Sequence, residues 1–139
     1  MKNYLLDTGA LFLILTKQTP QKWKRYLTEI KSQVKRLILI EPIIAELAYH
    51  LIKRGLDKTE LQTKLIQIKY KSKIISLEDK YSIKAAYYRK NLPYNLSLVD
   101  RYILAIAKET RAKIITTDHK IKLAARKEGI KVDYLPIQK

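Results

Sequence analysis

Four carboxylates interrupt or end apolar segments of this sequence, in a chain with only 13 acidic residues against 29 basic ones. They are Asp7, Glu46, Asp100 and Asp118. Carboxylate oxygens are the ligands that hard divalent cations such as Mg²⁺ and Mn²⁺ prefer. Several carboxylates can crowd together only if a cation offsets their mutual repulsion. If folding brings these four together, we expect them to bind a divalent metal ion.

Each of the four acids also has an ordinary structural role open to it. Asp7 can end a strand by accepting hydrogen bonds from the backbone amides that follow it. Asp118 can cap a helix, and Ser97-Leu98-Val99-Asp100 is a capping-box pattern with Asp in place of Glu. Glu46 can lie on the outer face of an amphipathic helix, although its same-side neighbours are not lysines. The four together indicate a metal site more strongly than any one of them does.

The chain is strongly basic. Its net charge is +16 and its pI is about 9.9, which indicates a polyanionic partner such as nucleic acid. The alternative is a lysine-rich solvated surface with no such partner. A basic surface around an acidic, metal-binding centre suits phosphodiester cleavage, because the cations attract the backbone while the metal activates water and stabilises the developing charge.

Composition also excludes several classes of site. There is no cysteine, so neither a disulfide framework nor a thiolate zinc site can form. The two histidines, His50 and His119, leave little for a histidine-rich metal site. With 47% apolar residues and no membrane-length apolar stretch or signal peptide in view, we expect a single cytoplasmic domain over residues 1–139.

Short apolar runs typical of buried strands alternate with segments of helical periodicity. Helices are expected over 10–15, from Thr19-Pro20 to about residue 35, from Pro42 to Gly55, from Asp57 through Ile68, from a Ser76-to-Asp79 cap through Tyr88, over 97–109 and over 118–128. Strands are expected at 3–6, 37–40, 73–75, 114–115 and 132–135.

This alternation predicts a three-layer α/β/α sandwich with a mainly parallel central sheet of four to five strands. In such sheets the functional crevice lies at the carboxyl ends of the strands. Asp7 and Asp118 follow the first and fourth strands, and Glu46 lies one turn into the helix after the second. These three are therefore expected at one edge of the sheet. The position of Asp100, which begins a helix, is less determined.

The four acids lie in short motifs that recur in one family. The motifs are Leu6-Asp7-Thr8, then Ile44-Ala45-Glu46-Leu47, then Ser97-Leu98-Val99-Asp100 opening an Ala-containing helix, then Ile114-Ile115-Thr116-Thr117-Asp118. Each motif is short, but the ordered set spans essentially the whole chain. In this order the chain resembles a PIN-domain ribonuclease, and is most similar to the VapC-type toxins of toxin–antitoxin pairs.

The resemblance implies a metal-dependent endoribonuclease that uses Mg²⁺ or Mn²⁺ and acts as the toxin of such a pair. It further implies a homodimer and a VapB-like antitoxin whose tail occupies the active cleft. Carried over residue by residue, it gives Asp7, Glu46, Asp100 and Asp118 as the catalytic, metal-binding acids, and Thr8 and Thr116 as supporting residues.

The sequence departs from the family pattern at two places. Gly9 stands where the family often has Asn or Ser, so a supporting hydrogen bond is expected to be missing. Arg101 and Tyr102 follow Asp100 where small or apolar residues are common. Arg101 is therefore a candidate RNA contact, with a solvent-facing role as the alternative.

Two further functions are compatible with parts of the sequence. A PIN domain can act in RNA processing, or can bind RNA or scaffold a complex without catalysis, but a degenerate domain of that kind is expected to lose acids. The run Leu5-Leu6-Asp7-Thr8-Gly9-Ala10 also resembles the active-site turn of a retroviral-type aspartic protease, whose paired aspartates share a proton. That fold is all-β and glycine-rich, whereas this chain has three glycines and long helical periodicities.

Overall fold

A computed structural model describes residues 3–136 and contains a five-stranded, fully parallel sheet. The strand order across the sheet is β3-β2-β1-β4-β5. The predicted class, a parallel sheet of four to five strands between helices, is thereby confirmed. Of the predicted domain, residues 1–2 and 137–139 lie outside the described part. The strands are β1 (Asn3–Leu6), β2 (Arg36–Leu39), β3 (Ser72–Ile74), β4 (Lys113–Thr116) and β5 (Val132–Tyr134).

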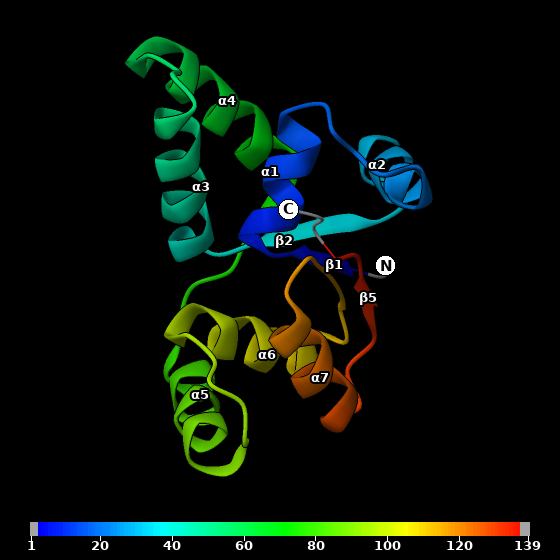
Figure 1. The fold of residues 1–139 in the computed structure, drawn as a ribbon, viewed down its shortest axis with the longest axis vertical. Coiled ribbons are helices and arrows are strands. Elements are labelled where there is room, and N and C mark those ends of the chain that lie inside the picture. The colour runs from blue at the N-terminus through cyan, green and yellow to red at the C-terminus, as the bar shows by residue number, and fades with distance from the viewer. Residues whose placement is uncertain (1–2, 137–139) are drawn as a thin grey trace.

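Helices cover both faces of the sheet and make the three layers visible in Figure 1. Helices α1 to α4 lie on one face, and α5 to α7 lie on the other. No helix within residues 3–136 has the length and hydropathy needed to cross a membrane. The helices are α1 (Thr8–Leu15), α2 (Lys24–Lys31), α3 (Glu41–Lys53), α4 (Lys58–Tyr70), α5 (Asp79–Asn91), α6 (Leu98–Thr110) and α7 (His119–Lys127), with a 3₁₀ turn at Gln21–Trp23.

The centre of the sheet is buried on both faces, which is why its strands are continuous apolar runs rather than alternating ones. Leu5 of β1 is paired with Ile38 of β2 on one side and with Ile114 of β4 on the other, and all three are buried. The first, second and fourth strands are therefore fixed side by side. Their carboxyl ends, and the residues just beyond them, meet at one edge.

Several helix ends match the local sequence signals. Asp57 and Glu60 form a complete capping box at the start of α4. Gly55, with φ +106°, follows α3, and Gly129, with φ +70°, follows α7. Both glycines occupy the left-handed region that L side chains avoid, so the expected helix ends at Gly55 and near residue 128 are confirmed.

Four local predictions are wrong. Thr19 does not cap a helix, since Pro20 precedes the 3₁₀ turn and α2 begins only at Lys24. That helix also ends four residues early, because Gln33 takes a left-handed φ of +62°. Ser76 does not cap α5, because Glu78 occupies the N-cap position and no side chain there accepts a hydrogen bond from the helix. Finally, α1 begins at Thr8 rather than Ala10.

Candidate metal centre

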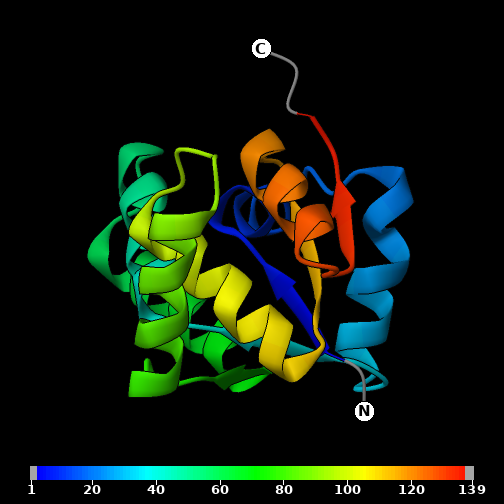
Figure 2. The same ribbon diagram turned by 90° about the horizontal axis from the view of Figure 1, so that it is seen from below.

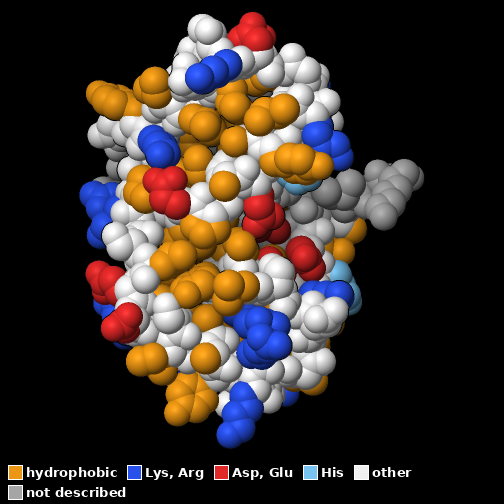
Figure 3. Space-filling view, turned by 90° about the vertical axis from the view of Figure 1, so that its left-hand side faces the viewer, with side chains coloured by type: hydrophobic (Ala, Val, Ile, Leu, Met, Phe, Trp, Pro, Cys, Tyr) orange, Lys and Arg blue, Asp and Glu red, His pale blue; other side chains and the backbone are white. Residues whose placement is uncertain are grey.

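All four predicted acids line one cavity at the carboxyl edge of the sheet, with a volume of about 190 Å³. On the face shown in Figure 3, acidic side chains near the centre are flanked above and below by hydrophobic ones. Asp100, whose position the sequence left open, reaches the cavity from the first turn of α6. The lining residues are Asp7, Thr8, Gly9, Glu46, Val99, Asp100, Ile103, Thr117 and Asp118.

Asp7 is the deepest of the four acids, with 6% of its surface exposed. It follows β1 directly and serves as the N-cap of α1, because its Oδ1 accepts a hydrogen bond from the backbone N–H of Ala10 at 2.9 Å. Its Oδ2 accepts a hydrogen bond from the hydroxyl of Thr116. The backbone of Asp7 is also fixed, since its N–H donates to the carbonyl of Ile115. The carboxylate is thus held rigidly at the floor of the cavity.

Burial raises the pKa of Asp7 to about 6. The hydrogen bonds from Thr116 and from the backbone N–H groups of Ala10 and Thr117 act in the opposite direction, while the charge of Asp118 raises the pKa further. Near neutral pH the metal-free site therefore holds a carboxylate that is poorly solvated and repelled by a neighbour. A bound cation would relieve both costs.

Thr116, the supporting residue carried over from the family, is fully buried at the end of β4. Its hydroxyl donates to Asp7 and accepts a hydrogen bond from the backbone N–H of Asp118 at 2.9 Å. One hydroxyl therefore connects two of the four acids. Thr8, the other supporting residue, is half-buried and lines the cavity beside Asp7.

Asp118 and Asp100 both take part in capping a helix, which is the structural role that the sequence left open to each of them. Oδ1 of Asp118 accepts hydrogen bonds from the backbone N–H groups of Lys120, at 2.8 Å, and Ile121. Oδ2 of Asp100 accepts one from the backbone of Ser97, whose hydroxyl in turn accepts from the backbone of Asp100. Each cap uses only one carboxylate oxygen. Capping and metal binding are therefore compatible for both residues.

The remaining predicted residues occupy the margin of the site. Glu46 lies on α3 and is exposed, although it lines the cavity. Burial raises the pKa of Asp100 against the hydrogen bonds from Ser97, and the charge of Asp118 adds to the rise. Arg101 is half-buried and does not line this cavity, so its candidate role in RNA contact stays a prediction.

Three residues that line the cavity were not predicted from the sequence. Val99 and Ile103, on α6, make an apolar wall beside the acids. Thr117 also lines the cavity, and a Cβ placed on Gly9 would lie only 2.3 Å from its hydroxyl oxygen. The signal for Thr117 was its position between Thr116 and Asp118, immediately after a strand that ends at the functional edge.

The donor set fits a hard divalent cation. All the charged donors are carboxylates, and no histidine or sulfur ligand lines the cavity. Within residues 3–136, no three His, Asp or Glu side chains are already gathered at metal-binding distance. Four like charges are expected to stand apart when nothing offsets their repulsion. The set therefore suits an ion that keeps several of its own waters.

The model of the PIN domain family matches residues 4–127. The chain belongs to the PIN domain family. PIN domains are nuclease domains as a family, so the predicted family and the coarse prediction of a nuclease are confirmed. Comparison with curated proteins gave no match.

The fold also matches several solved structures. A chain of VapBC2 from Rickettsia felis, bound to a DNA fragment from its promoter, superposes with a TM-score of 0.74 at 20% identity, covering 96% of this chain and 98% of that one. A chain of VapBC-1 from nontypeable Haemophilus influenzae gives a TM-score of 0.67 at 16% identity, with 95% and 97% covered. FitAcB from Neisseria gonorrhoeae gives 0.68 at 19% identity, with 93% and 95% covered. At these identities the match establishes a shared fold.

Proposed function

We propose that this PIN domain is a metal-dependent endoribonuclease that uses Mg²⁺ or Mn²⁺, acts as the toxin of a toxin–antitoxin pair, and functions as one domain over residues 1–139. The single observation that supports the chemistry most directly is the cavity itself. Four carboxylates from four separate segments line it, in a chain of net charge +16. An acidic site on a strongly basic protein suits a polyanion held by cations and cleaved at a metal.

In this proposal the residues Asp7, Glu46, Asp100 and Asp118 hold the cation. When bound, it supplies an activated water and stabilises charge on the phosphate. Thr116 keeps the carboxylate of Asp7 in one orientation, because its hydroxyl is fully buried and donates to that carboxylate. Val99 and Ile103 limit water at one side of the acids, which strengthens electrostatic interactions there.

The protease alternative has no support in this fold. The run Leu5 to Ala10 forms the end of a parallel strand and the first turn of α1, not a turn in an all-β domain. The two remaining alternatives are a PIN domain in RNA processing and a non-catalytic RNA-binding module. Retention of all four acids around the cavity argues against the second.

The test of this proposal is cleavage of a labelled RNA by the purified protein, with Mn²⁺, with Mg²⁺, and after removal of metal by a chelator. We expect internal cleavage that the chelator abolishes and that either added cation restores. Cleavage that persists without metal would contradict the proposed chemistry. RNA binding without any cleavage in both cations would instead favour the non-catalytic module.

We also propose a VapB-like antitoxin and a second copy of this chain as partners. Large hydrophobic side chains are exposed on α3, the helix that carries Glu46, and on α5, which packs against α6; among them are Tyr49 and Ile52 on α3 and Ile83 and Tyr87 on α5. Hydrophobic side chains also flank the acidic centre in Figure 3. Exposed apolar surface of this kind is typical of protein interfaces.

The partner proposal predicts that the product of an adjacent small reading frame, co-expressed with this chain, co-purifies with it and inhibits RNA cleavage. Replacement of Tyr87 by Glu should weaken the complex with this co-expressed protein, whereas Lys58→Glu on α4 should not. Sedimentation of the chain alone should give the mass of two copies. A chain that sediments as a monomer would contradict the proposed second copy. A chain that does not co-purify with the co-expressed protein would contradict the proposed antitoxin.

A further inference from the structure

A second, larger hollow lies at the opposite edge of the sheet from the acidic cavity. It has a volume of about 950 Å³ and is bounded by α2, the end of α6 and the amino ends of β1 and β4. A neighbouring hollow of about 370 Å³ lies at the amino ends of β2 and β3, and Lys35 lines both. In Figure 2, β1 and β5 run upward, away from this edge. We call the two hollows together the amino-edge groove.

The amino-edge groove is lined by basic side chains contributed at four of the five strands. Arg36 begins β2, Lys73 lies in β3, Lys113 begins β4, and Lys131 directly precedes β5. Only one carboxylate, that of Glu29, lines the larger hollow. The further basic residues of the groove are Arg25, Lys35, Lys71, Lys108 and Arg111.

These cations lack carboxylate partners. Within residues 3–136, every ion pair uses Lys22, Lys69 or Lys80, and none of these three lines the groove. Glu29 accepts a hydrogen bond from the Tyr4 hydroxyl at 3.0 Å. The groove therefore carries nine basic side chains against one carboxylate, and none of the nine forms an ion pair within the described residues.

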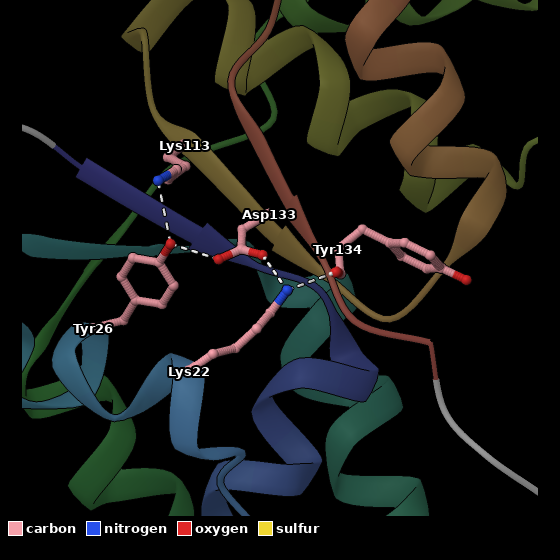
Figure 4. Close-up of polar contacts among 5 residues, drawn as sticks. All are labelled: Lys22, Tyr26, Lys113, Asp133 and Tyr134. Carbon is pink, nitrogen blue, oxygen red and sulfur yellow. Dashed lines mark hydrogen bonds and ion pairs between the residues drawn. The ribbon is translucent and has the colours of Figure 1, made fainter.

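The acid of β5, Asp133, is bound to Tyr26 and Lys22, as Figure 4 shows. Asp133 accepts a hydrogen bond from the Tyr26 hydroxyl at 2.6 Å and pairs with Lys22 at 2.9 Å. Lys113 donates to the Tyr26 hydroxyl at 3.2 Å rather than to a carboxylate. This network links α2 to β4 and β5, and its carboxylate, that of Asp133, does not line the groove.

We propose that the amino-edge groove is a second binding site, for single-stranded RNA, separate from the acidic cavity. A row of cations across a sheet whose strands stand about 4.8 Å apart matches the repeated charge of a phosphodiester backbone better than it matches a single phosphate. Tyr70, which is 85% exposed, lines the groove beside Lys71. An exposed aromatic ring beside a basic track is a platform on which an unpaired base can stack, and a duplex offers no such base.

Because the two sites lie at opposite edges of the sheet, a long RNA can occupy both at once, whereas a short one can occupy only one of them. The groove then raises affinity for long substrates without touching the reacting phosphate. This inference rests on the proposed ribonuclease function for the choice of RNA. Its test measures binding in an Asp7→Asn background with a chelator present, so that it does not depend on cleavage.

The test compares two double variants with the same change in net charge. Lys35→Glu with Lys131→Glu alters the groove, and Lys58→Glu with Lys90→Glu alters exposed lysines at the start of α4 and the end of α5. For a long, labelled single-stranded RNA, we expect the groove variant to bind about tenfold more weakly and the control to bind within about twofold of the parent. The slope of log K against log[salt] should fall by about 0.7 for each phosphate that the groove variant no longer neutralises.

A third variant, Tyr70→Ala, tests the occupant. We expect weaker binding of single-stranded RNA with an unchanged salt slope, because stacking contributes affinity without charge. Equal binding by the groove variant and the control would overturn the proposal, as would preference for a duplex of the same sequence or for anionic lipid vesicles over RNA. If circular dichroism shows that the groove variant is unfolded, the double variant Lys35→Gln with Lys131→Gln replaces it. The matched control is then Lys58→Gln with Lys90→Gln.

Discussion

Gly9 and Thr117 share one space beside the acidic cavity. A Cβ built on Gly9 would lie 2.3 Å from Oγ1 of Thr117 and 3.7 Å from Oδ1 of Asp7. The resemblance to the family predicted a missing hydrogen bond at Gly9. The structure places a second hydroxyl, that of Thr117, where a side chain at position 9 would stand. Among the described residues this hydroxyl donates no hydrogen bond that would hold it elsewhere.

This arrangement predicts that positions 9 and 117 are energetically coupled. Gly9→Ala should destabilise the metal-free protein because the new methyl group displaces the β-branched side chain of Thr117. Combining it with Thr117→Ala should remove much of that cost. Urea unfolding of the four proteins in a double-mutant cycle measures the coupling, expected to exceed about 0.5 kcal/mol. Strictly additive effects would show that the two positions do not compete.

A second prediction concerns pH. The folded Asp7 carboxyl, with a pKa of about 6 against 3.8 for an unperturbed Asp, holds its proton more tightly than the unfolded one. Between these two values the folded state therefore binds more protons, and the free energy of unfolding falls as pH rises. Above about pH 6 the loss is complete, on the order of 3 kcal/mol from this residue.

The predicted loss of stability with rising pH is measured by urea unfolding in the presence of a chelator, at several pH values from 4 to 8. The difference in stability between Asp7→Asn and the parent should grow in favour of the variant as pH rises from 4 to 6. A difference that does not change with pH would mean that Asp7 ionises as easily in the folded protein as in the unfolded chain.

The third prediction separates the two roles of Asp100. If Asp100 only completes the capping box of α6, Asp100→Ala should cost about 1 kcal/mol and leave activity well below the melting temperature nearly unchanged. If it also binds metal, RNA cleavage should collapse and the stabilisation conferred by Mn²⁺ should shrink, since linked stability depends on affinity. We predict the second result, in part because Asp100 lines the acidic cavity.

A matched control for Asp100 exists within the chain. Glu60 holds the same position in the capping box of α4, and it lines none of the hollows described above. Glu60→Ala should lower the melting temperature while keeping both the Mn²⁺-induced shift and cleavage. If Asp100→Ala behaves in the same way as Glu60→Ala, Asp100 is a cap and nothing more.

Much of the site was predictable because sheet topology converts sequence position into spatial position. Asp7 and Asp118 each follow an apolar strand, and parallel strands end at one edge. Glu46 follows from the same rule, one turn into α3. The rule says nothing about Asp100, because Asp100 does not follow a strand: its position depends on how the start of α6 is placed by packing against α5, α7 and β1.

The errors have a common cause, which is competition between local signals. Ser76 and Asp79 match a capping pattern, but Glu78 takes the N-cap position instead. The first helix was expected to begin at residue 10, yet Asp7 caps it earlier in the chain and Gly9 lies within it. The proximity of Gly9 to Thr117 could not be predicted from the sequence, because the two residues are distant in sequence and meet only after β1 and β4 pair.

The central claim is that the cavity acids hold a divalent cation that cleaves RNA. The measurement that tests it most directly is the initial rate of RNA cleavage, as a function of Mn²⁺ concentration, for the parent and for Asp7→Asn. The substitution keeps the shape of the side chain and removes its charge. We predict that the folded variant shows no Mn²⁺-dependent cleavage and a smaller Mn²⁺-induced rise in melting temperature. A folded Asp7→Asn protein with the parent's rate and Mn²⁺ dependence would contradict the claim.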